Sequence, residues 1–240
     1  MFFGMLRKKE EQYEDANYWI SFTDFALSFL ISFLLLSSLL LAHQYQQKIK
    51  LENSMREIQE NYAVRANIAK KLKEAFLNDS TVNVDEISGT ITLKENAIEF
   101  YPDLPILKSD PEYIDRFFSK YISALKSTCS PDGSINYYDE GYIKRIIIEG
   151  HVNRVSEYGT YMELSQNRAL TVYNRIYNQI QTDNALKERV QAVGRGHFVP
   201  YGDGSSASAN RRVEFHFTLN EEKIVENVIG AQTETKGTGE

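Results

Sequence analysis

An uncharged run of eighteen residues, 25–42, constrains this chain more than any other part of its sequence. Its apolar side chains are interrupted only by serines, which are Ser28, Ser32, Ser37 and Ser38. As a helix, the low-charge stretch 18–42 would be about 37 Å long, against a hydrocarbon core of about 30 Å. The sequence therefore predicts a single transmembrane helix, assigned to residues 17–42.

Two other structures for this run fit less well. A cleaved signal peptide has a shorter apolar core, followed by a small-residue cleavage site, whereas His43-Gln44-Tyr45 follows here. A buried helix of a globular protein would be left without a polar face. The orientation stays open on charge alone, because three basic residues stand on each side: Arg7, Lys8 and Lys9 before the span, and Lys48, Lys50 and Arg56 after it.

Composition excludes several classes of function. The net charge of −6 and the lack of a dense basic stripe argue against a direct nucleic-acid partner. The single Cys129 excludes an intrachain disulfide framework. No nucleophile–base pair, paired carboxylates or metal-ligand spacing emerges, so we expect no enzyme, no bound cofactor and no metal site. His151 is interpreted as a residue that orients a loop, because no second metal ligand stands at a suitable spacing.

The segments around the span have different characters. Residues 1–16 are polar, and we expect a poorly ordered segment. Residues 43–80 predict a helical stalk with a heptad-like apolar seam, in which Arg65 takes one position. The other members of the seam are Met55, Ile58, Tyr62, Ala69, Leu72 and Phe76. A dimeric stalk is preferred to the alternative, an amphipathic helix that folds back onto the globular domain.

Residues 81–220 predict an α+β domain. After a turn-rich break at 78–84, the patterns predict an order β-α-β-α-β-β, with helices on one face of a mixed sheet. Asp110 and Pro111 are the N-cap and first residue of a helix through Leu125. The other expected elements are strands at 89–93, 97–100, 145–150, 190–194 and 213–219 and a helix at 162–180. The tail at 221–240 is expected to be disordered.

Four blocks of this domain occur in the order that a known family uses. They are Gly150-His151-Val152-Asn153, Leu164-Ser165-Gln166-Asn167-Arg168-Ala169, Gly194-Arg195-Gly196 with Pro200, and Asn210-Arg211-Arg212-Val213. Together they resemble the OmpA C-terminal family over roughly residues 84–219. The resemblance implies an OmpA-like fold that binds peptidoglycan through its diaminopimelate stem.

The resemblance also implies a set of wall-binding residues. Arg168 matches the family's arginine, whose guanidinium can fork onto a carboxylate. Asn153 stands where the family has an acid, and Tyr161 where it has an asparagine, so the site is altered. The full implied set is Asn153, Tyr161, Leu164, Arg168, Asn210 and Arg211. A purely structural alternative is that Arg168 pairs with Glu149 or Glu163.

Asp24 is the one ionisable residue between Asp15 and His43. An acid at such a depth costs a few kcal/mol by insertion scales, unless it is paired, protonated or facing water. It therefore predicts an ion-carrying site. The alternative is a helix cap at the membrane surface, in which Ser21 and Asp24 form a capping-box-like pair.

Trp19, Phe22, Thr23, Asp24 and Phe25 resemble the MotB pattern W-x-x-x-Y-A-D-F/L, with Phe22 and Thr23 in place of its Tyr and Ala. The resemblance to MotB-type stators implies that the aspartate carries the coupling ion, H⁺ or Na⁺. It also implies a homodimer of B subunits inside a ring of five MotA-like A subunits. The N-terminus would be cytoplasmic and residues 43–240 periplasmic, in a bacterial inner membrane.

Within this family the chain looks most like ZorB, the MotB-like subunit of the Zorya anti-phage motor, whose partner is the MotA-like ZorA. Its short N-terminal segment and the long helix directly after the span carry this preference. Two alternatives stay open: a flagellar MotB-type stator, and a passive OmpA-like tether without ion flow.

Overall fold

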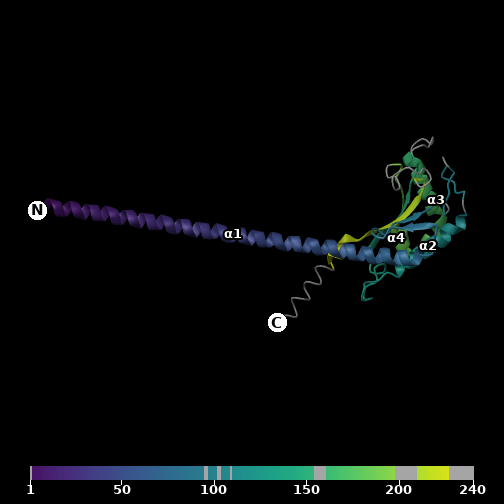
Figure 1. Ribbon diagram of the computed structural model, residues 1–240, viewed down its shortest axis with the longest axis horizontal. Helices are drawn as coiled ribbons and strands as arrows, with labels where there is room; N and C mark the ends of the chain where they lie inside the picture. The colour runs from purple at the N-terminus through teal and green to yellow at the C-terminus, as the bar shows by residue number, and fades with distance from the viewer. Residues whose placement is uncertain are drawn as a thin grey trace. The chain divides into compact units, whose positions relative to one another are not determined.

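The computed structural model describes residues 2–94, 97–101, 104–108, 110–153, 161–197 and 210–226. The chain divides into two compact units, Met1–Met55 and Arg56–Glu240. Helix α1 (Phe2–Phe76) supplies all of the described first unit and the beginning of the second (Figure 1). The two units are therefore linked by helical residues.

The first unit contains the predicted span. Among the described residues, α1 is the one helix long and apolar enough to cross a membrane by length and composition. Its most apolar window of eighteen residues has a mean hydropathy of 2.4 and is entirely unburied. The expectation of poor order at 1–16 was wrong for residues 2–16, which are helical. The reason lies in their composition, which lacks proline and includes three glutamates and two lysines, both good helix formers.

The predicted stalk seam divides into two parts. Its last members, Ala69, Leu72 and Phe76, are buried in the second unit. Val64 and Ile68, which the predicted seam did not include, are buried in the core with them. These residues make the last turns of α1 a core element of the domain. The earlier seam residues Met55, Ile58 and Tyr62 stay 54–69% exposed. The fold-back alternative is therefore correct for the end of the stalk helix.

Five strands form one mixed sheet in the order β1-β2-β5-β3-β4. Strands β3 and β4 are parallel, and the other neighbours are antiparallel. Their bounds are Val82–Val84 (β1), Ile91–Leu93 (β2), Ile143–Gly150 (β3), Val190–Gly194 (β4) and Val213–Leu219 (β5). The mixed sheet and the predicted α+β class are confirmed.

Two differences from prediction lie at the start of the domain. The segment expected to be a turn-rich break contains β1, which pairs with β2 in register Val82↔Leu93. The strand expected at 97–100 is absent from its described residues, where Phe100 makes only an isolated bridge to Leu107. Both outcomes depend on which neighbouring segment a short stretch pairs with, and the local pattern does not reveal this.

Helices α2 (Pro111–Lys126) and α3 (Tyr161–Gln181) confirm the two predicted helices. Asp110 caps α2 as expected, accepting a hydrogen bond from the backbone N–H of Glu112. The short helix α4 (Asn184–Arg189), capped by Asp183, was not predicted. Residues 221–226 are also helical, with Ile224 fully buried, so the prediction of disorder was wrong for them. Residues 227–240 lie outside the described part.

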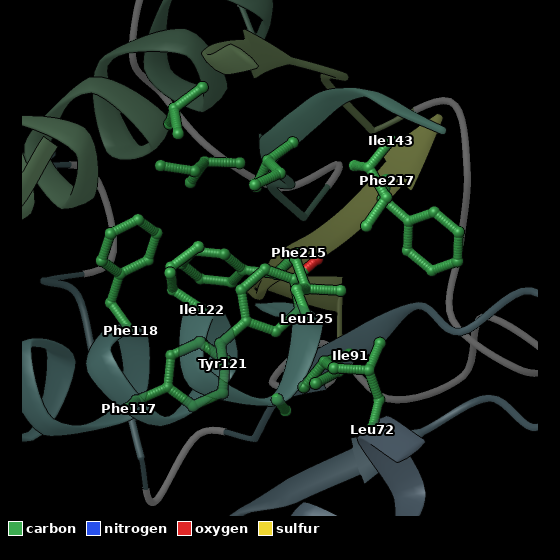
Figure 2. Packing of buried hydrophobic residues seen from close by; sticks show 14 of the residues in the cluster. Leu72, Ile91, Phe117, Phe118, Tyr121, Ile122, Leu125, Ile143, Phe215 and Phe217 are labelled. Atoms are coloured by element: carbon green, nitrogen blue, oxygen red, sulfur yellow. The ribbon is translucent and has the colours of Figure 1, made fainter. Parts of the chain in front are cut away.

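The core has an aromatic centre around Phe215 of β5 (Figure 2). Its ring centroid lies 4.9 Å from that of Phe117 and 5.7 Å from that of Tyr121, both on α2. Phe215 is paired across the sheet with Ile148 of β3, so these two side chains share a face. The alternate residues of β3 and β5 consequently lie on the opposite face.

Candidate functional site

The motif blocks of the sequence meet at one end of the sheet. Because β3 and β4 are parallel and β5 is antiparallel to β3, the ends of β3 and β4 lie beside the start of β5. Backbone hydrogen bonds join the three loops there: His151 N–H to the Arg212 carbonyl (2.9 Å), Val152 N–H to the Gly196 carbonyl (3.1 Å), and Arg195 N–H to the Gly150 carbonyl (2.9 Å). The candidate site is this end of the sheet, where the loops after Gly150 and Gly194 and the loop before Val213 are joined by backbone hydrogen bonds. We call it the mouth.

Two glycines let the start of α3 lie directly against this mouth. A Cβ on Gly150 would stand 2.2 Å from the Ser165 carbonyl oxygen, and one on Gly194 would stand 2.5 Å from the Gln166 backbone nitrogen. The same region is hydrogen-bonded, since Gly196 N–H donates to Ser165 Oγ at 2.8 Å. Helix α3 is therefore held against the ends of β3 and β4 by contacts with strand backbone.

Arg168 lies in the interior of the domain. Its side chain is fully buried, its Nη2 donates to the Tyr101 carbonyl at 3.0 Å, and its guanidinium lies 5.1 Å from the Phe100 ring centroid. One turn later, Thr171 Oγ1 donates to the Pro105 carbonyl at 2.7 Å. Helix α3 thereby holds the backbone of Tyr101 and of Pro105, a role that the sequence did not predict for Arg168.

One of the two structural partners proposed for Arg168 is excluded. The carboxylate of Glu149 faces His151, His216 and Arg195 instead. Glu149 therefore belongs to a different group of charges, on the face of the sheet opposite Phe215.

The other implied wall-binding residues are distributed around the mouth. Tyr161 begins α3, and its ring centroid lies 4.5 Å from that of His197. Leu164 is fully buried and Asn210 nearly so, whereas Asn153 and Arg211 are partly exposed. The loop segments at 154–160 and 198–209, including Pro200 of the third block, lie outside the described residues.

A polar cluster that the sequence did not predict lies on the sheet next to the mouth. Glu149 of β3 is paired in register with Glu214 of β5, and His151 follows β3 directly. His151 Nε2 lies 3.1 Å from Glu149 Oε1 and 3.6 Å from Glu214 Oε2. Polar residues at alternate positions of otherwise apolar strands were the available signal. It was missed because the cluster combines β3 with a strand more than sixty residues away.

The members of this cluster shift one another's protonation. Burial raises the pKa of Glu149, but the neighbouring imidazoles of His151 and His216 outweigh it and hold this pKa well below its ordinary range. Burial likewise opposes ionisation of Glu214, yet His151 and Arg212 lower its pKa to about 2. Burial lowers the pKa of His151, and the two carboxylates reverse this and raise it. The cluster therefore holds two ionised carboxylates inside the domain.

Asp24 lies within α1, far from its first residue, Phe2. The alternative of a helix cap formed with Ser21 is therefore wrong, because both residues are in the interior of the helix. Thr23, the residue directly before Asp24, donates a hydrogen bond from its Oγ1 to the Trp19 carbonyl at 2.9 Å, and the rings of Trp19 and Phe22 meet edge to face at 6.2 Å. Asp24 itself is exposed on the helix surface.

No family model and no curated protein matches this sequence. Among solved structures, the chain is similar to the cell wall anchor of the T6SS from Pseudomonas aeruginosa, with 17% identity and a TM-score of 0.45 over 65% of this chain and 99% of that one. It is also similar to the periplasmic domain of Helicobacter pylori MotB, with 17% identity and a TM-score of 0.44 over 64% and 99%. A putative MotB-like protein from Desulfovibrio vulgaris gives 16% identity and 0.46 over 68% and 99%. These similarities concern the fold alone.

Proposed function

We propose that this chain is the B subunit of an ion-driven rotary motor in the bacterial inner membrane, anchored to peptidoglycan by its C-terminal domain. In this proposal a homodimer stands inside a ring of five MotA-like subunits, and ion flow past Asp24 turns that ring. Residues 43–240 are periplasmic and the N-terminus is cytoplasmic. The motor is of the Zorya type, with this chain as its ZorB and a ZorA-like partner.

The observation that carries the proposal is Asp24, in the interior of the apolar helix. An unpaired carboxylate in a membrane costs a few kcal/mol, and such residues are retained mainly where they pair, bind an ion or line an aqueous path. Asp24 lies on α1 directly before the uncharged run 25–42, and in this proposal it meets a partner subunit. A bound H⁺ or Na⁺ neutralises it, and release of the ion restores its charge.

The other half of the proposal is a fixed anchor. The mouth beside α3 presents partly exposed Asn153 and Arg211, with Tyr161 at the start of the helix. The wall site we propose comprises Asn153, Tyr161, Leu164, Arg168, Asn210 and Arg211. Buried Leu164 and Arg168 would shape and support this site, while the exposed residues meet the peptide stem.

Asp24→Asn tests the ion-carrier role. The amide has nearly the same shape but cannot bind and release a proton, so we expect loss of phage protection with normal membrane assembly. Protection is measured as phage plating efficiency in cells that express the chain with its ZorA-like partner, and assembly by co-purification. Asp24→Glu should retain part of the activity. Ser21→Asn is the matched control, because it places the same amide one turn earlier in α1.

Unchanged protection by Asp24→Asn would remove ion flow from the model and leave the passive tether. Restoration of swimming in a strain lacking its flagellar MotB, without phage protection, would assign the chain to the flagellum instead. Each result identifies one of the three functions considered.

Wall anchoring is tested by co-sedimentation of the full chain, in detergent, with insoluble peptidoglycan. We expect binding by the wild type and at least tenfold weaker binding by Arg168→Ala. Because Arg168 also holds the Tyr101 carbonyl, near-UV circular dichroism must show that this variant stays folded. Asn153→Asp is a second test. It adds a carboxylate that can pair with the ammonium group of the diaminopimelate stem, so it should strengthen binding. Absence of binding by the wild type would remove the anchor from the proposal.

A further inference from the structure

The face of the sheet opposite the aromatic core carries an arrangement that the proposed motor does not use. Glu149 and Glu214 stand directly opposite each other on β3 and β5. Like charges in that position destabilise a sheet unless positive charge lies between or beside them. His151 lies with them, and its side chain is only 1% exposed. Arg212, Arg195 and His216 supply part of the compensating charge, and a bound cation would supply the rest.

The distances from His151 to the two carboxylates are close to those of a metal centre. One ligand atom from each of Glu149, His151 and Glu214 lies within 4.8 Å of the others. Around a tetrahedral zinc ion with bonds of about 2.1 Å, ligand atoms stand roughly 3.4 Å apart. The observed separations of His151 Nε2 from the two carboxylate oxygens are 3.1 and 3.6 Å. An ion could enter with small side-chain movements.

The imidazole of His151 gives an independent indication. Its Nε2 is buried and makes no hydrogen bond with any of the described residues, although two carboxylate oxygens lie near it. The nitrogen thus lies 3.1 Å from one carboxylate oxygen and 3.6 Å from the other without a hydrogen bond of normal geometry to either. A buried imidazole nitrogen that is close to two carboxylate oxygens and not hydrogen-bonded to them is available as a metal ligand.

The surrounding residues complete the arrangement. Arg212 Nε holds the other oxygen of Glu214 at 2.5 Å, and His216 Nε2 lies 3.3 Å from the other oxygen of Glu149. Each of these contacts uses one oxygen of its carboxylate, so the second oxygen of Glu149 and of Glu214 is the one that lies near His151 Nε2. Arg195 Nε lies 3.3 Å from that oxygen of Glu149, but its side chain is 54% exposed and can turn into solvent.

We propose that Glu149, His151 and Glu214 bind one divalent transition-metal ion, such as Zn²⁺, which fastens the loop after β3 to the start of β5. Two carboxylates balance the charge of the ion, and one imidazole suits a borderline metal. The fourth position is left for water. Since β3 ends in the loop that carries Asn153, and β5 follows Arg211, the ion would stabilise the mouth whether or not that mouth binds peptidoglycan.

The test is zinc binding by the purified full chain in detergent, with a tag that contains no histidine. After treatment with EDTA and dialysis, Zn²⁺ is titrated in competition with a chromogenic chelator. We expect one ion per chain with a dissociation constant below about 1 μM, and a higher melting temperature with zinc, because the ion binds only the folded state. Ca²⁺ and Mg²⁺ should compete poorly, because both prefer more oxygen ligands.

Two variants remove one ligand each. Glu214→Gln keeps an oxygen for Arg212, and His151→Gln keeps a polar side chain of similar length. Each should weaken zinc binding at least a hundredfold and abolish the thermal shift. His43→Gln, on the exposed part of α1, is the matched control and should bind zinc as the wild type does. Absence of stoichiometric zinc in the wild type, or undiminished binding by both cluster variants, would overturn the proposal.

Discussion

Gly150 and Gly194 show at the residue scale how a motif glycine positions a site. Both end strands, and both lie where α3 passes so close that a single added carbon has no room. The family resemblance includes these glycines in its pattern, but the reason for them is steric contact across the sheet–helix interface. Because neither glycine has a side chain, α3 can pack directly against the strand ends, and this packing positions Arg168 and Tyr161 on the helix.

Gly150→Ala should therefore destabilise the domain. Its Cβ would stand 2.2 Å from the Ser165 carbonyl oxygen, which is backbone and cannot rotate away. We expect a loss of about 1–3 kcal/mol or more in the free energy of unfolding, measured by urea titration with tyrosine near-UV circular dichroism. Gly133→Asn is the control, because nothing lies within 4 Å of that Cβ and asparagine tolerates its φ of +75°. Equal stability of the two variants would contradict this account of the interface.

At the scale of elements, α1 changes its environment along its length. Its residues at 25–42 suit hydrocarbon, Met55, Ile58 and Tyr62 are exposed, and its last turns belong to a globular core. The heptad-like pattern correctly predicted a helix and an apolar stripe. It could not identify what covers the stripe, because a coiled-coil partner and a domain core require the same spacing.

The two parts of that stripe should differ in their contribution to stability. Leu72→Ala removes a fully buried side chain and should cost about 2–5 kcal/mol. Ile58→Ala changes a residue that is 69% exposed, and we expect less than about 0.5 kcal/mol for the domain. Urea unfolding at low protein concentration measures both. A large loss for Ile58→Ala that grows with protein concentration would instead show a dimeric stalk.

Two short elements, β1 and α4, were missed by the sequence patterns. Strand β1 has three residues and α4 has six, so neither contains enough periods for an apolar pattern to emerge. Strand β2 is equally short, but the alternation at 89–93 extends beyond it and predicted it. The longer elements α2, α3, β3 and β5 were predicted close to their observed bounds. Their apolar positions repeat several times, and Asp110 with Pro111 marks the start of α2.

At the scale of the whole molecule, the chain passes from the apolar segment into the domain core without a glycine or proline between residues 43 and 76. In the proposed motor, Asp24 carries the ion in the first unit, and the mouth binds peptidoglycan in the second. The tests of Asp24→Asn and of Arg168→Ala consequently address separate units. Wall binding by the Asp24→Asn variant stays measurable by co-sedimentation even when protection is lost.

The sequence by itself determined the apolar helix, the position of Asp24 within it, the α+β class and the order of the motif blocks, because these depend on residues close together in the chain. Only the tertiary structure decided that Arg168 is buried against Phe100, that the last turns of α1 join the core, and that Glu149, His151 and Glu214 come together. Each of these depends on strand register or on contacts between distant segments. Local periodicity contains no information about either.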